Sequence, residues 1–89
     1  MIERELAIRN RLGLHARAAA KFVQMASRFK SAVKIRKNGE EVDGKSILGI
    51  LLLAASQGTR ITVAVVGEDE RDAFAAVEDL IVRSFDEEE

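Results

Sequence analysis

The 89-residue chain has no cysteine, proline, tryptophan or tyrosine. Without cysteine there are no disulfides, thiolate nucleophiles or cysteine-based metal sites, and this composition fits a reducing cytoplasm. Basic and acidic residues number 14 and 15, so no global field recruits nucleic acid or an anionic membrane. The N-terminal stretch is charged from Glu3 onward, unlike a signal peptide or an anchor. The longest strongly apolar run, residues 47–55, is about half the ~20 residues of a membrane span. We therefore expect a cytoplasmic protein without a membrane segment.

The apolar content of 47% predicts one compact domain over residues 1–89. Alternating or β-branched apolar residues predict four strands, and apolar residues at three- and four-residue spacing predict helices between them. The strands are predicted at 2–8, 32–37, 41–43 and 60–67, and the helices at 16–29, 46–56 (stopped by Gln57-Gly58) and 68–85 (capped by Asp69). This βαββαβα order predicts an α+β fold in which an antiparallel sheet carries its helices on one face. Residues 86–89 are all acidic and are predicted to fray.

Residues 38–46, NGEEVDGKS, match the G-x-x-x-x-G-K-[ST] pattern of a nucleotide-binding loop. The variable positions include Glu40, Glu41 and Asp43, whose carboxylates would repel a polyphosphate. Such a loop also belongs to a mostly parallel sheet, whereas the predicted sheet is antiparallel. We therefore interpret Asn38-Gly39 as a hairpin turn and expect no nucleotide binding.

The single histidine, His15, stands immediately before the first predicted helix. The N-terminus of a helix presents unpaired N–H groups and the positive end of the helix dipole, which disfavour imidazolium and favour a bound anion. A neutral imidazole at this position can act as a nucleophile and hold a phosphoryl group on a ring nitrogen. Arg17, in the first turn, could pair with the phosphate oxygens. The alternative is a capping histidine without a further role.

Four motifs occur in order along the chain: GLHAR opening an alanine-rich helix, NG in a hairpin, DGKSILGIL, and QGTRITV. At matched separations across nearly the whole chain, they closely resemble the HPr family, the histidine-containing phosphocarrier proteins of the sugar phosphotransferase system. The resemblance implies an open-faced β-sandwich in which three helices cover four antiparallel strands. This architecture agrees with the pattern of apolar residues.

The resemblance also implies that His15 is phosphorylated on Nδ1 by enzyme I, which draws on phosphoenolpyruvate, and passes the phosphoryl group to an enzyme IIA domain. Arg17 matches the active-site arginine of the family, and the backbone N–H groups of Ala16 and Arg17 are expected to face the phosphate. The family usually has proline where this chain has Ala18, and we expect slightly altered preorganisation from this change. The expected protein is a monomeric covalent carrier without turnover of its own, and it needs no cofactor.

Ser46 matches the serine that HPr kinase/phosphorylase modifies in many members of the family. A phosphate there would add ~1.5–2 negative charges at the start of a helix, although Ser46 could serve only as an N-cap. The resemblance places partner docking on Ala20, Ile47, Leu48 and Leu51.

Two alternatives stay open. A nitrogen-related or regulatory paralogue would share the His15 chemistry without serving sugar transport, and the acidic SFDEEE ending has some of that character. A small α+β protein could also bind nucleic acid by stacking bases on aromatic residues of its sheet. All four aromatics are phenylalanines outside the predicted strands, so we expect no nucleic-acid partner.

Overall fold

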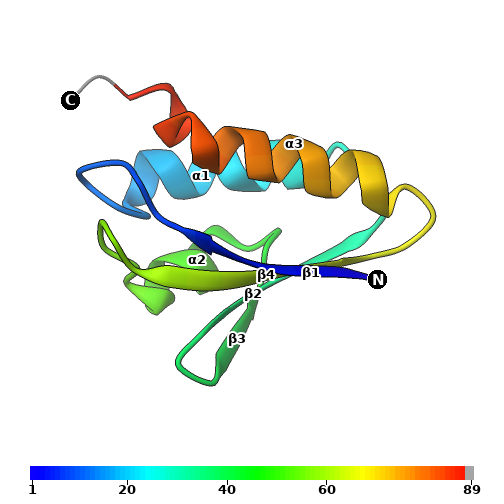
Figure 1. The fold of residues 1–89 in the computed structure, drawn as a ribbon, viewed down its shortest axis with the longest axis horizontal. Coiled ribbons are helices and arrows are strands. Elements are labelled where there is room, and N and C mark those ends of the chain that lie inside the picture. The colour runs from blue at the N-terminus through cyan, green and yellow to red at the C-terminus, as the bar shows by residue number, and fades with distance from the viewer. Residues whose placement is uncertain (88–89) are drawn as a thin grey trace.

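The computed structural model describes residues 1–87 and contains a four-stranded antiparallel sheet with helices on one face (Figure 1). The strands are β1 (Ile2–Ala7), β2 (Ala32–Lys37), β3 (Glu40–Asp43) and β4 (Arg60–Val66), in the spatial order β1-β4-β2-β3. The helices are α1 (Ala16–Ala26), α2 (Ile47–Leu53) and α3 (Glu70–Val82), followed by the short 3-10 helix η1 (Ser84–Asp86). Helices α1 and α3 lie over the sheet (Figure 1), and α2 contacts both α1 and β3. The predicted α+β open-faced sandwich is confirmed.

The core lies between the sheet and the helices. Alternate residues of the central strands point into it, including Val33 and Ile35 of β2 and Val63 of β4. Phe22 of α1 and Phe74 of α3 pack against this layer and are buried. The strand period of two and the helix period of 3.6 therefore place their apolar residues on the same interface. Among the described residues, no helix is long and apolar enough to cross a membrane.

The hairpin between β2 and β3 turns at Asn38 and Gly39. Their φ angles are 51° and 83°, the left-handed conformation at both central positions of a tight hairpin turn. Lys37 pairs with Glu40 across the turn, which confirms the predicted hairpin. The four variable residues of the nucleotide-loop pattern therefore form β3. The Lys45 Nζ donates a hydrogen bond to the Phe29 carbonyl at 2.8 Å.

Helix α2 ends earlier than predicted. Ala54 adopts a left-handed conformation with φ 51° and ψ 43°, which stops the helix before Gln57-Gly58. The Lys37 Nζ donates to the carbonyl oxygens of Leu53 at 2.9 Å and Ala54 at 3.3 Å. A cation from the hairpin therefore satisfies carbonyl groups that the end of a helix leaves unpaired. The predicted stop at Gln57-Gly58 was wrong. The residue that ends the helix in the left-handed conformation is an alanine, Ala54, and not the glycine that usually marks such a position.

The chain after α3 is ordered through Glu87, contrary to the predicted fraying of residues 86–89. Phe85 is fully buried, and its packing into the core anchors this segment to the rest of the domain. The Lys21 Nζ donates to the Phe85 carbonyl at 2.6 Å. The prediction was wrong for residues 86–87 because it ignored the anchoring effect of Phe85, and its remaining residues, 88–89, lie outside the described part of the chain.

Candidate functional site

The loop before α1 is fixed to the segment that follows α2. Gly13 has a φ of 66°, and a Cβ at this position would lie 2.4 Å from the Ala55 carbonyl oxygen. The Leu14 N–H donates to the same oxygen at 2.8 Å. Only glycine allows both the left-handed backbone and this close approach. The loop therefore delivers His15 to the N-cap of α1, next to α2, as the sequence predicts.

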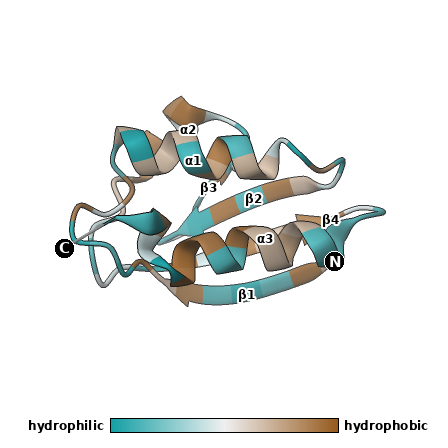
Figure 2. Ribbon diagram, turned by 90° about the horizontal axis from the view of Figure 1, so that it is seen from above, coloured by the Kyte–Doolittle hydropathy of each residue, from teal (hydrophilic) through white to brown (hydrophobic). Residues whose placement is uncertain are grey.

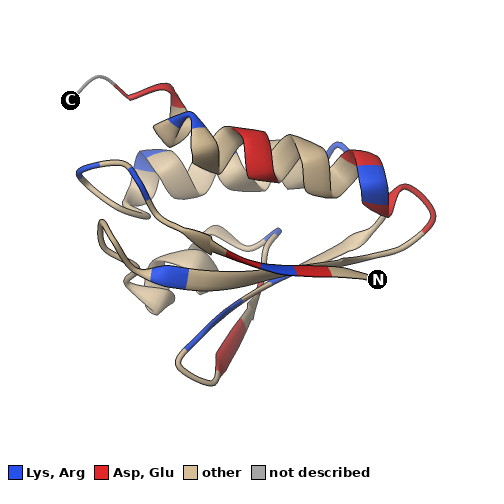
Figure 3. Ribbon diagram, viewed as in Figure 1, with Lys and Arg blue, Asp and Glu red and all other residues tan. Residues whose placement is uncertain are grey.

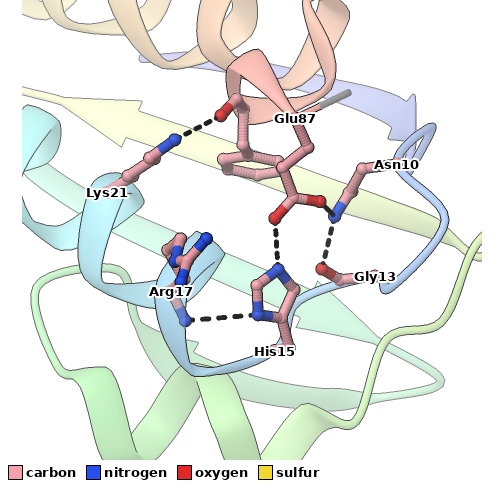
Figure 4. Close-up of polar contacts among 7 residues, drawn as sticks. Asn10, Gly13, His15, Arg17, Lys21 and Glu87 are labelled. Carbon is pink, nitrogen blue, oxygen red and sulfur yellow. Dashed lines mark hydrogen bonds and ion pairs between the residues drawn. The ribbon is translucent and has the colours of Figure 1, made fainter. Parts of the chain in front are cut away.

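Both nitrogens of the His15 ring have partners (Figure 4). Nδ1 faces the Arg17 backbone N–H at 3.3 Å, and Nε2 contacts the Glu87 carboxylate. A backbone N–H can only donate and an ionised carboxylate can only accept. The two partners together assign the tautomer in which Nε2 carries the proton and Nδ1 keeps its lone pair.

Glu87 reaches His15 from the far end of the chain, 72 residues away in sequence. Its other oxygen accepts from the Asn10 Nδ2 at 2.8 Å, and that amide group also donates to the Gly13 carbonyl at 2.7 Å. Burial raises the pKa of Glu87, but hydrogen bonds from Asn10 and His15 and the nearby positive charge outweigh it, so the net pKa lies below its ordinary value. Glu87 is therefore ionised at neutral pH.

Three consecutive left-handed residues bring Glu87 to this position. Ser84, Phe85 and Asp86 have φ angles of 54°, 56° and 60°. None is glycine, so each costs about 1–2 kcal/mol relative to right-handed backbone. The buried Phe85 ring and its carbonyl bond from Lys21 offset part of this strain. Strained backbone is thus concentrated beside the only histidine of the chain.

An open cavity of about 630 Å³ lies beside His15. Its wall is formed by the preceding loop, by Ala16, Arg17 and Lys21 of α1, and by the acidic residues Asp86 and Glu87. Figure 3 shows basic residues in this loop and on α1, close to the acidic end of the chain. Arg17 is exposed and makes no ion pair within residues 1–87, so its guanidinium can bind an oxyanion. The helix N-terminus and the Arg17 guanidinium suit a phosphoryl group at Nδ1, while Asp86 and Glu87 bring negative charge to the same cavity.

The expected docking residues fall into two groups. Ile47 and Leu48 of α2 are exposed, with 43% and 68% of their surface accessible, and Figure 2 shows hydrophobic colouring on α2. Ala20 and Leu51 are half-buried, and Leu51 packs against the core. Ser46 caps α2, since its Oγ accepts the Gly49 N–H at 3.1 Å.

Two exposed leucines and two polar residues near His15 were not singled out from the sequence. Leu12 and Leu52 are exposed, at 61% and 69%. Because α2 is apolar on nearly all sides, its sequence does not show which leucine faces solvent. Leu12 lies in a loop whose composition is mostly polar, so it was not considered. Asn10 and Glu87 complete the surroundings of His15, but no spacing or motif links them to it.

The sequence and the fold are both similar to those of known proteins. The sequence model described as "PTS HPr component phosphorylation site" matches residues 2–83. The phosphocarrier protein HPr of Xylella fastidiosa (strain Temecula1 / ATCC 700964) is 52% identical over 87 residues, covering 98% of each chain. The structure of HPr-C-His from Thermoanaerobacter tengcongensis gives a TM-score of 0.96 at 45% identity, covering 100% of both chains. HPr from Bacillus anthracis gives 0.86 at 38% identity, covering 90% of this chain and 95% of its own. The chain therefore belongs to the HPr family of phosphocarrier proteins of the phosphotransferase system.

Proposed function

We propose that this protein accepts a phosphoryl group on His15 Nδ1 from phosphorylated enzyme I and passes it to enzyme IIA domains. The observation that carries the proposal is the position of Nδ1. It holds a lone pair at the N-terminus of α1, beside an exposed arginine and an open cavity. A nucleophile next to an anion site is what a reversible phosphoryl acceptor requires.

In this step the Nδ1 lone pair forms a bond to phosphorus, while the bond between phosphorus and the donor atom of enzyme I breaks. The electron pair of the broken bond remains with the donor. Backbone N–H groups of Ala16 and Arg17 and the Arg17 guanidinium stabilise the phosphoryl oxygens. In onward transfer the bond from Nδ1 to phosphorus breaks and a bond to the IIA domain forms. The protein is therefore a covalent intermediate without independent turnover, and it acts in the cytoplasm.

Partners dock on the surface formed by Ile47, Leu48 and Leu51 of α2 together with Ala20 of α1. The exposure of Ile47 and Leu48, on a helix that contacts α1, supports this assignment, since patches of exposed apolar residues mark interaction sites. An HPr kinase/phosphorylase regulates docking by phosphorylating Ser46, and the carrier works as a monomer. The half-buried Ser46 hydroxyl lies at the start of this same helix.

The test is incubation of the full chain with enzyme I and labelled phosphoenolpyruvate. We expect an acid-labile phosphoryl adduct on the wild-type protein and none on His15→Ala. A stable adduct, or labelling of His15→Ala, contradicts the assignment. Transfer from the labelled protein to sugar-specific and nitrogen-specific IIA domains then identifies which pathway receives the phosphoryl group.

A further inference from the structure

We propose that Glu87 is a positioning residue for phosphoryl transfer, because its carboxylate holds the Nε2–H of His15 and so keeps Nδ1 as the nucleophile. This inference rests on the proposed function. The Glu87 carboxylate is itself held, since Asn10 donates to one oxygen while His15 occupies the other. Only 13% of the Glu87 side chain is exposed, so water competes weakly for these contacts.

Asn10 gives the carboxylate a fixed orientation. The Asn10 side chain is fully buried, and its amide group is shared between the Gly13 carbonyl and Glu87. The loop that places His15 and the tail that places Glu87 therefore meet at one amide (Figure 4). The Lys21 bond to the Phe85 carbonyl holds the tail on its other side.

Phosphorylation changes the charge that Glu87 faces. The neutral ring attacks through Nδ1 and keeps its proton on Nε2, so the phosphorylated ring is an imidazolium with substituents on both nitrogens. No proton needs to move during the step. The contact between Nε2–H and the carboxylate becomes a charge-assisted hydrogen bond as positive charge develops on the ring. Glu87 thereby supplies a counter-charge on the side of the ring opposite the phosphoryl group.

The geometry distinguishes two substitutions of Glu87. In Glu87→Gln, the Asn10 donor requires the amide oxygen on its own side, which turns the new NH₂ group toward Nε2 of His15. A donor at that position favours the tautomer with the proton on Nδ1, which removes the nucleophilic lone pair. Glu87→Ala removes the carboxylate without placing a donor there. The nearly isosteric glutamine should therefore impair transfer more than alanine does.

The experiment combines two measurements on the full chain. Long-range proton–nitrogen NMR spectra of the neutral ring report its tautomer without any partner protein. The single-turnover rate of labelling by enzyme I and phosphoenolpyruvate reports transfer. Glu68→Gln removes the same charge from an exposed residue between β4 and α3 and serves as the matched control. Circular dichroism verifies that each variant is folded.

We expect the wild-type protein and Glu68→Gln to show the Nε2–H tautomer and equal rates. Glu87→Gln should populate the Nδ1–H tautomer and be labelled roughly tenfold more slowly, with Glu87→Ala between them. A wild-type ring protonated on Nδ1, or a Glu87→Gln variant labelled at the wild-type rate, overturns the inference while the proposed function stands. Failure of enzyme I to label the wild-type protein overturns the proposed function, and the role of Glu87 in transfer with it.

Discussion

The carboxylate of Asp69 accepts hydrogen bonds from both the backbone N–H and the hydroxyl of Ser31. A further bond comes from the Lys30 N–H at 2.9 Å. Asp69 occupies the N-cap position of α3, yet its side chain makes no cap hydrogen bond to that helix. The predicted cap position is confirmed, but the carboxylate binds donors just before β2 and not the N–H groups of its own helix.

We expect this contact to make stability depend on acid pH. The Ser31 hydroxyl bond, followed by the Lys30 N–H bond, lowers the pKa of Asp69 to about 2 in the folded protein, whereas an unfolded aspartate titrates near about 3.9. The stabilisation is therefore present above about pH 4 and is lost as the pH falls toward about 2. Urea unfolding across this window should show the advantage of wild type over Asp69→Asn shrinking as the pH falls. Parallel profiles for the two proteins would contradict the assignment.

Ala54→Gly should stabilise the protein by about 0.5–1 kcal/mol. Ala54 is exposed and left-handed, so glycine relieves strain that outweighs its larger entropy loss on folding. The free energy of unfolding in urea gives the measurement. Ala75→Gly, at an exposed site inside α3, is the control and should lower stability by up to about 1 kcal/mol. Destabilisation by both changes would show that Ala54 is not strained.

Three substitutions of Ser46 separate its capping role from the effect of charge. Ser46→Ala removes the acceptor of the Gly49 N–H and should cost about 1 kcal/mol of stability. Ser46→Asn and Ser46→Asp both keep a capping oxygen, so their stability should stay close to wild type. Only Ser46→Asp adds negative charge beside the docking surface, and it should slow labelling by enzyme I several-fold. Equal slowing by asparagine would exclude charge as the cause.

Gly13→Ala should destabilise the protein more than Gly39→Ala does. Both glycines have positive φ angles, but a Cβ on Gly39 meets no heavy atom within 4 Å. Gly39→Ala therefore carries only backbone strain of about 1–2 kcal/mol. Gly13→Ala adds a clash with the Ala55 carbonyl and should also shift the NMR signals of the His15 ring. Equal losses of stability would mean that the backbone at Ala55 can move away from the new Cβ without lowering the free energy of unfolding further.

The strands, the hairpin and the position of His15 were predictable because each depends on neighbouring residues. The alternation of apolar and basic residues predicted the observed limits of β2, residues 32–37. The pair Asn38-Gly39 predicted a left-handed hairpin turn from its own two residues. The histidine was placed correctly at the N-cap of α1. These features follow from spacings of a few residues, which the amino-acid order displays directly.

Features that depend on distant residues could not be predicted in this way. The bonds of Asp69 to Ser31 and of Glu87 to His15 join residues 38 and 72 positions apart. A uniform apolar helix also conceals its orientation, so the sequence did not show that Leu51 packs partly against the core or that Leu52 is exposed. The left-handed Ala54 had no glycine to mark it.

The contact between His15 and Glu87 also sets when the site can exist during synthesis of the protein. His15 leaves the ribosome early, but its carboxylate partner is the seventy-second residue after it. Until that residue has emerged and Phe85 has packed into the core, the nascent chain presents a histidine whose ring is held only by its own helix. The complete arrangement around His15 therefore belongs to the finished fold, and a translation arrest before Glu87 yields a chain that lacks it.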